Sequence, residues 1–318
     1  MNKIVGLYPK SSYIQVVDHF VPMELTAQSD IKKPYQVYFP FAKGVIELSG
    51  KDTGTFLQAL TTNDILSLSE SESKRTLFTN PNGKILFDCF IRKTEDKFLL
   101  VTDPGDEKRL IEHLEFYHIT EDVKLKDVSA NYEVFFILDE ENNYNGEFLK
   151  AAQKLYESKD TKLKVYLIPA DETHYESLTK NGVQPIGLVF FEDLRPLFGF
   201  ARAGVDFGID QIPQEASLEN CISLSKGCFT GQEPIARLTH RGQINKKLKT
   251  ILSPQPLRAG CRLFLDQKEV GLITSASPIK TEKGYYSLGY IKTKQVQDLI
   301  PQTLIVEDTP VEISVQPE

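Results

Sequence analysis

The chain has 318 residues, with 37 Lys plus Arg against 44 Asp plus Glu, and a formal net charge of −7. At roughly 100 to 200 residues per domain, this length predicts two or three packed units, and a hydrophobic content of 41% is enough to give each a core. The composition excludes a disordered, collagenous or coiled-coil chain, and the acidic balance disfavours binding nucleic acid through a global positive field.

The first residues lack the apolar core of a secretory signal, and the longest apolar runs are far below the ~18 residues of a membrane span. We therefore expect a soluble, cytoplasmic protein with reduced thiols and no membrane partner. The four cysteines form no CxxC pair and no zinc-type spacing with the five histidines, so no metal site is predicted. These cysteines are Cys89, Cys221, Cys228 and Cys261.

The amino-terminal third begins with a weakly patterned stretch, residues 1 to about 35, which we interpret as an extension on the surface. Residues 44–50 then alternate like a strand. Residues 52–60 place their apolar side chains at helical spacing behind Asp52, a suitable N-cap. A strand followed by a helix is predicted here.

Residues 76–93 contain two alternating runs around Asn80-Pro81-Asn82-Gly83, and Asn-Gly is among the strongest hairpin signals. The sequence therefore predicts a β-hairpin. In its second strand Asp88 shares a face with Leu86 and Phe90. Two alternatives stay open for this carboxylate: exposure at a sheet edge, or partial burial with a partner.

The rest of the sequence predicts a mixture of helices and strands, followed by a region of short strands with little helix. Expected in order are a strand at 97–102, a helix at 106–117, strands at 123–128 and 132–139, a helix around 146–157, a strand at 163–168 and a helix near 171–181. Short strands separated by Pro, Gly and Asp follow at 247–252, 261–265, 268–276, 284–293, 303–307 and 310–315. This pattern indicates an α+β body, residues 1–240, which two interleaved subdomains could share, and a small antiparallel β-barrel, residues 241–318.

Residues 221–242, CISLSKGCFTGQEPIARLTHRG, carry the most distinctive chemistry. A strand-like run leads to Cys228, and Pro234 suits the first turn of a helix. Two glycines would free the backbone around Cys228, while helix amides and a nearby Lys226 would favour its thiolate. The alternative is a tight turn in which Cys228 fills a small gap in the core. The segment is not a nucleophile elbow, because the cysteine directly follows the first glycine.

Several arginines stand out in an acidic chain. Arg195, Arg202 and Arg237 have guanidinium groups whose geometry suits a carboxylate or a phosphate. The alternative is that these arginines pair with acidic residues of the chain itself, such as Glu192 or Glu233. Both readings stay open at this point.

The run KGCFTGQE, followed by AR and RG, resembles the K-G-C-[FY]-x-G-Q-E signature of the YgfZ-type folate-binding proteins. That family shares its fold with the aminomethyltransferase (T-protein) of the glycine cleavage system. The resemblance covers roughly residues 40 to 293: the opening strand and helix with its T-N-D ending, the hairpin, LRPLFGFARAGVDFG, and the barrel strands VGLITSAS and SLGYI. It implies an α+β, T-protein-like folate-binding body with a small C-terminal antiparallel β-barrel.

The resemblance also implies a set of site residues. Cys228 would be the catalytic or reactive residue, and tetrahydrofolate or a one-carbon derivative would be the cofactor. The residues implied to bind it are Asp88, Arg195, Arg202, Lys226, Gln232, Glu233 and Arg237.

Two departures from the transferase pattern bear on function. Aminomethyltransferases typically carry two adjacent acids in the hairpin strand and a Glu two residues after the Arg of L-R-x-E-x-G, whereas this chain has Phe87 before Asp88, and Leu197. The resemblance thus implies a tetrahydrofolate-binding accessory protein that supports assembly or repair of iron-sulfur clusters in enzymes, including tRNA-thiolating ones. Its partners would be folate and iron-sulfur client or assembly proteins, with no direct nucleic-acid contact.

Two rival functions remain. The first is a folate-dependent aminomethyltransferase of glycine-cleavage type, which Asp88 keeps open. The second is a hydrolase or acyltransferase with Cys228 as its nucleophile and His240 as the base nearest to it in the sequence.

Overall fold

The structure is a computed structural model that describes residues 36–41, 44–139, 152–157, 163–170, 177–178, 180–241, 244–294, 302–307 and 309–316. The expected amino-terminal extension and most of the helices expected at 146–157 and 171–181 lie outside these residues. None of the described helices is both long and apolar enough to cross a membrane. The chain forms two compact units, which we call the sheet unit and the barrel unit. The sheet unit takes its residues from Met1–Phe78, Phe87–Leu188 and Ser225–Thr230, and the barrel unit takes its residues from Thr79–Leu86, Val189–Leu224 and Gly231–Glu318.

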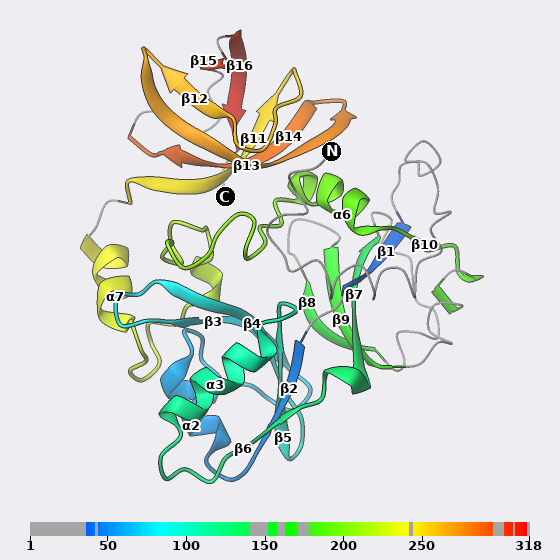
Figure 1. The fold of residues 1–318 in the computed structure, drawn as a ribbon, viewed down its shortest axis with the longest axis vertical. Coiled ribbons are helices and arrows are strands. Elements are labelled where there is room, and N and C mark those ends of the chain that lie inside the picture. Colours follow the sequence, from blue (N-terminus) through cyan, green and yellow to red (C-terminus); the bar gives the residue numbers. More distant parts are fainter. Residues whose placement is uncertain are drawn as a thin grey trace. The chain divides into compact units, whose positions relative to one another are not determined.

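The first sheet of the sheet unit confirms the predicted elements between residues 44 and 128 (Figure 1). Its strands run in the order β3-β4-β5-β2-β6, so the apolar β2 lies between two antiparallel neighbours. Helix α2 packs against β5, and α3 packs against β2 and β6. The elements are β2 (Gly44–Ser49), α2 (Thr53–Leu60), β3 (Ser73–Thr79), β4 (Ile85–Lys93), β5 (Lys97–Thr102), α3 (Glu107–Tyr117) and β6 (Lys124–Asp127).

The turn between β3 and β4 explains why Asn80 and Gly83 occur there. The Asn80 Oδ1 atom accepts hydrogen bonds from the backbone N–H groups of Asn82, at 2.9 Å, and Lys84, at 3.0 Å. Gly83 has φ of 74°, which is the left-handed region that glycine adopts without strain. The predicted hairpin is confirmed.

Asp52 does occupy the N-cap position of α2, but its carboxylate accepts from the N–H of Asp122 instead of capping the helix.

The second sheet has the order β10-β1-β7-β9-β8, antiparallel except between β1 and β10. The helix expected around 146–157 is wrong where it can be checked, because residues 153–157 form strand β8. The backbone of β8 pairs with β9, and Leu155 is buried, so tertiary pairing decides a conformation that local spacing left ambiguous. The strands are β1 (Gln36–Phe41), β7 (Tyr132–Asp139), β8 (Gln153–Glu157), β9 (Leu163–Pro169) and β10 (Gln184–Pro185).

A group of rings packs between α3 and the hairpin strands. The His113 ring on α3 lies 5.9 Å from Phe78, 5.5 Å from Phe87 and 5.1 Å from Tyr117, measured between ring centroids. Burial among these rings lowers the pKa of His113, because the charged imidazolium loses its hydration. The neutral ring therefore belongs to the folded state.

We expect His113→Phe to make the protein less sensitive to mild acid. Below a pH of about 6.5 the unfolded chain binds a proton at His113 that the folded chain resists, so the wild type loses stability as the pH falls. The Phe variant keeps an aromatic ring and has no proton to bind. Urea titrations between pH 7.5 and pH 5 should show the wild type losing free energy of unfolding relative to the variant, by at most about 1.4 kcal/mol per pH unit. Identical pH profiles would contradict this assignment.

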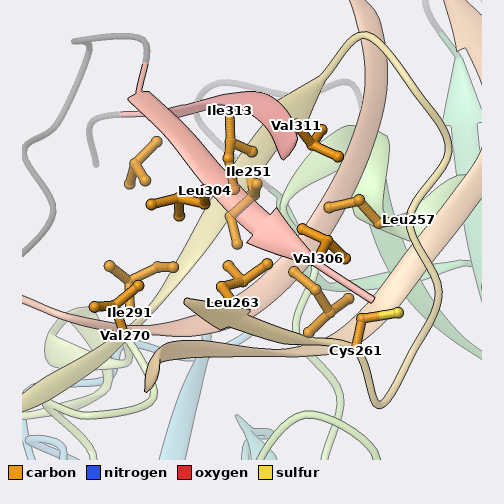
Figure 2. Close-up of a cluster of buried hydrophobic side chains, with 12 residues drawn as sticks. Ile251, Leu257, Cys261, Leu263, Val270, Ile291, Leu304, Val306, Val311 and Ile313 are labelled. Carbon is orange, nitrogen blue, oxygen red and sulfur yellow. The ribbon is translucent and has the colours of Figure 1, made fainter. Parts of the chain in front are cut away.

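The carboxyl-terminal strands close into a barrel in the order β11-β14-β13-β12-β15-β16. All six strands predicted after residue 246 are confirmed, and every neighbouring pair in the register is antiparallel. Side chains such as Ile251, Leu263 and Ile313 fill the interior (Figure 2). The strands are β11 (Lys246–Ser253), β12 (Arg262–Leu265), β13 (Lys268–Thr281), β14 (Gly284–Lys292), β15 (Gln302–Val306) and β16 (Thr309–Val315).

Candidate functional site

Cys228 lies in an irregular segment rather than at a strand-to-helix junction. The expected strand at 221–225 is wrong, because the N–H groups of Cys221 and Ile222 bond three residues back in local turns and not to a neighbouring strand. Helix α7 (Gln232–Arg241) begins four residues after Cys228. We call residues 225–230 of the sheet unit the thiol loop.

The thiol of Cys228 is the accessible one. All four cysteines of the chain are described, all are free, and Cys228 alone is exposed. The alternative in which this cysteine fills a gap in the core is therefore wrong. Exposure is one of the two conditions for a reactive cysteine, the other being thiolate character.

Lys226 was expected to act on the thiol by charge, yet its ammonium is bound elsewhere. The Nζ atom donates to the backbone carbonyls of Gln58 at 2.5 Å, Thr61 at 2.5 Å and Asn63 at 2.9 Å. It also lies 5.0 Å from the centre of the Phe229 ring. These contacts place the cation at the carboxyl end of α2.

The two glycines of the motif have different roles. Gly231 has φ of +83°, and a Cβ there would lie 2.5 Å from the carbonyl oxygen of Asn80 and 3.1 Å from the Cα of Gly83. The hairpin turn thus packs directly on the backbone that leads into α7, and this contact requires glycine at position 231. A Cβ on Gly227 would meet nothing within 4 Å, so crowding does not require glycine there.

Arg195 and Arg202 come together around acidic residues of the barrel unit. Arg195 Nε donates to Glu192 Oε2 at 2.6 Å, and its Nη1 donates to Asp206 Oδ2 at 2.5 Å. Its Nη2 donates to Ser275 Oγ at 2.5 Å, so every nitrogen of this guanidinium is bonded. Arg202 Nη1 bonds the other oxygen of Glu192. A folate carboxylate would have to compete with these partners.

Asp206 ties the same network to the barrel. Its Oδ1 atom accepts from the hydroxyl groups of Thr274 at 2.6 Å and Ser275 at 2.7 Å, both on β13. Its Oδ2 accepts from Arg195 and from the backbone N–H of Arg202 at 3.0 Å. The side chains of Arg195 and Asp206 are 1% and 0% exposed, so this is a fully buried ion pair with satisfied hydrogen bonds.

In the sheet unit, Asp88 has the buried partner that one alternative required. Arg75 Nε donates to Asp88 Oδ1 at 2.9 Å, and Arg75 Nη2 donates to Asp88 Oδ2 at 2.6 Å. The two side chains are 9% and 10% exposed. This fork-to-carboxylate pair uses an oxygen on each side of the carboxylate, as is typical of strong arginine pairs.

The three remaining predicted residues lie on α7. Gln232 is its first residue and is half-buried, whereas Glu233 and Arg237 are exposed. Arg237 Nη2 lies 3.0 Å from Glu233 Oε1, with side chains 71% and 84% exposed. Because an exposed pair of this kind is worth little free energy, Arg237 can exchange its partner for an incoming anion.

The sequence did not point to two of the partners that engage these residues. Glu192 is among the acids expected to pair with the arginines, and it does so. Arg75 and Asp206 were not expected as partners, although Asp206 is the final acid of the L-R-x-x-x-G-x-x-R-x-G-x-D stretch and so carried a signal. Arg75 had none, since its pairing depends on the register of the hairpin. Within the described ranges no cluster of His, Cys, Asp and Glu could hold a metal ion.

Comparison with known proteins finds one family model that matches part of this chain, and several relatives of 25% to 27% identity. Residues 42–138 match the family model described as the GCVT N-terminal domain. The chain is 27% identical over 289 residues to a chloroplastic protein of Arabidopsis thaliana whose name describes a transferase, which covers 83% of this chain and 67% of the relative. It is 25% identical over 303 residues to the aminomethyltransferase of Listeria welshimeri, covering 82% and 83% of the two chains.

A further relative concerns iron-sulfur clusters, and a solved structure shows the fold. The chain is 25% identical over 224 residues to the mitochondrial iron-sulfur cluster assembly factor IBA57 homolog of Mycosarcoma maydis, covering 65% of this chain and 54% of the relative. The glycine cleavage system aminomethyltransferase T of Bartonella henselae superposes with a TM-score of 0.72 at 18% identity, over 89% of this chain and 85% of that one. The expected T-protein-like fold is confirmed. The cytoplasmic location stays a prediction, since these relatives include chloroplastic and mitochondrial proteins.

Proposed function

We propose that this protein is a tetrahydrofolate-binding accessory protein that supports assembly or repair of iron-sulfur clusters, and that Cys228 is its functional residue. The observation that carries the proposal is the exposed thiol of Cys228 on a loop fixed to the carboxyl end of α2. A thiolate is the common protein ligand and nucleophile of cluster chemistry, whereas the other three thiols are buried. The likeness to the IBA57 homolog supports this class of function.

Folate binding is the less directly supported half of the proposal. Of the charged residues that we predicted to bind it, Asp88, Arg195, Arg202 and Lys226 all have internal partners. Arg237, with its exchangeable surface pair, and the half-buried Gln232 are the groups best suited to a glutamyl carboxylate and an amide. Bound folate would supply a one-carbon carrier, and the protein's own part would be to hold and orient it.

The rival function, aminomethyl transfer to folate, has support from the GCVT match and the aminomethyltransferase relatives. Three features of the chain disfavour it. Phe87 and Leu197 stand where the transferases typically carry acids, and Leu197 cannot accept a hydrogen bond from a pteridine. Both carboxylate oxygens of Asp88, the acid that remains, are bonded to Arg75.

We expect Cys228→Ala to impair the maturation of a subset of iron-sulfur enzymes, including a tRNA-thiolating one, at least several-fold. The fold should persist, because substitution of an exposed side chain usually changes the free energy of unfolding by no more than about 0.5 kcal/mol. The measurement is the activity of such enzymes in cells whose own copy of the gene is replaced by the variant. Cys261→Ala, which removes a buried thiol, is the matched control and should leave these activities near normal.

Calorimetric titration of the purified protein with tetrahydrofolate and its one-carbon derivatives tests the other half. Arg237→Ala should weaken binding by about 1 to 3 kcal/mol if its guanidinium pairs with the glutamyl carboxylate. Absence of binding at millimolar folate would remove the folate part. Normal maturation of every client in the Cys228→Ala strain would remove the iron-sulfur part.

A further inference from the structure

The ammonium of Lys226 binds the end of a helix that lies far from it in the sequence. The last carbonyls of a helix have no partner within the helix and must be satisfied from outside. Lys226 Nζ reaches two carbonyls of this kind, those of Gln58 in the last turn of α2 and of Thr61 at its C-cap, and also the carbonyl of Asn63 just beyond the helix. Because an ammonium has three donors, these carbonyls use its full capacity.

A second tether fixes the other end of the thiol loop to the same helix. The backbone N–H of Thr230 donates to the carbonyl of Ala59 at 3.2 Å. Cys228 is therefore flanked two residues on either side by bonds to α2. Between the tethers, Gly227 and Cys228 are exposed, while the ring of Phe229 is buried.

The surface that receives Lys226 is itself held in place. Gln58 Nε2 donates to Asp64 Oδ1 at 2.9 Å, and Gln58 Oε1 accepts from the N–H of Ile65 at 2.7 Å. Asn63 Nδ2 donates to the carbonyl of Arg75 on β3 at 2.9 Å. The carbonyls that bind the ammonium are thus fixed independently of the thiol loop, and they act as a preformed socket.

We propose that Lys226 is the positioning residue of Cys228: by binding three carbonyls at the end of α2, its ammonium fixes where the thiol is presented. Its charge is taken up by carbonyl dipoles, including those at the negative end of a helix, rather than by the thiol. The functional meaning of this position rests on the proposed role of Cys228. The positioning itself is a property of the fold and can be tested separately.

The burial of Lys226 shows how much lost hydration these carbonyls must replace. It lowers the pKa of Lys226 to about 8, while the nearby Asp64 carboxylate favours the charged form. A cation that loses this much hydration is retained only where acceptors replace the water. Removal of the ammonium would also leave three backbone acceptors without their donor, so we expect the loop to lose its anchor.

The test is the mobility of a nitroxide spin label on Cys228. The other thiols are buried, so the label attaches selectively, and the spectrum reports motion at this one site. We expect Lys226→Met to shorten the rotational correlation time of the label at least twofold relative to the wild type. Lys226→Gln, which keeps two amide donors, should give an intermediate value and serves if the Met variant does not fold.

Lys74→Met is the matched control. The Nζ of Lys74 also binds this region, donating to the carbonyl of Asp64 at 2.8 Å and to Ser67 Oγ at 2.6 Å, but not to the carbonyls that receive Lys226. It should leave the label as in the wild type. Equal mobility in the wild type and in both Lys226 variants, or the same increase in Lys74→Met, would overturn the proposal. The readout involves neither folate nor clusters, so its failure is distinct from failure of the proposed function.

Discussion

Arg195→Met should lower the free energy of unfolding by about 3 to 5 kcal/mol, the cost typical of breaking a buried ion pair from one side. The reason is the charge left behind. Asp206 would keep its full burial and its hydroxyl donors but lose its counter-ion, and Glu192 would lose one of its two guanidinium partners. Urea titration followed by circular dichroism measures the change.

Two further variants separate this network from a general effect of removing arginine. Arg195→Lys keeps the charge, but a single ammonium cannot serve Glu192, Asp206 and Ser275 together in the geometry of a guanidinium, so an intermediate loss is expected. Arg262→Met removes an exposed pair with Glu269 on the barrel and should cost no more than about 1 kcal/mol. A loss for Arg195→Met no larger than that for Arg262→Met would show that the network contributes little.

This expectation changes the meaning of any folate-binding defect in an Arg195 variant. Weakened binding in such a protein would follow from disturbance of the network as readily as from loss of a ligand contact. Arg237 is the sharper probe of binding, because its side chain is exposed and its substitution should leave the fold intact. Binding and stability must therefore be measured on the same preparations.

The parts of the fold that the sequence predicts well are those that local physics determines. Asn80 and Gly83 fix the hairpin turn through one side-chain acceptor and one left-handed backbone angle, and both are visible in the sequence. The barrel strands are short, alternate apolar and polar residues, and are separated by Pro, Gly and Asp. Their first and last residues can therefore be predicted from the amino-acid sequence. Neither feature depends on which distant segment lies next to it.

The errors arise where distant partners decide the structure. Residues 153–157 have a hydrophobic pattern that does not distinguish a helix from a strand. They form a strand because their backbone pairs with β9. The run before Cys228 has strand-like composition, yet its N–H groups close local turns and meet no neighbouring strand. Lys226 looked like a modifier of the thiol, because nothing in the sequence shows that the end of α2 presents three carbonyls to it.

The arginines illustrate the same limit at the candidate site. The sequence left open whether Arg195 and Arg202 bind a ligand or an acid of the chain, and the structure shows Glu192 and Asp206 against them. The order of residues shows only that these cations and acids are close in the sequence. Whether they meet depends on the packing of residues 192–206 against β13, which brings Thr274 and Ser275 to Asp206.

Asp88→Ala should lower the free energy of unfolding by about 2 to 4 kcal/mol, because it leaves the Arg75 guanidinium nearly buried without its carboxylate. Glu47→Ala is the control from the same sheet: it removes a partly exposed pair with Lys97 and should cost no more than about 1 kcal/mol. Asp88→Asn keeps the shape but removes the charge, and an intermediate loss is expected. Circular dichroism during urea titration again gives the values.

The same variants decide between the proposed function and the transferase. An acid that served one-carbon transfer would have to leave Arg75, and Asp88→Asn would then abolish methylene transfer from a glycine-cleavage carrier to tetrahydrofolate. We expect instead that the wild type and Asp88→Asn are equally inactive in that assay, since Phe87 and Leu197 replace the other acids. Robust transfer by the wild type that disappears in Asp88→Asn, with tRNA thiolation normal in cells lacking the protein, would make the transferase the better assignment and would give the Asp88–Arg75 pair a catalytic role in place of a structural one.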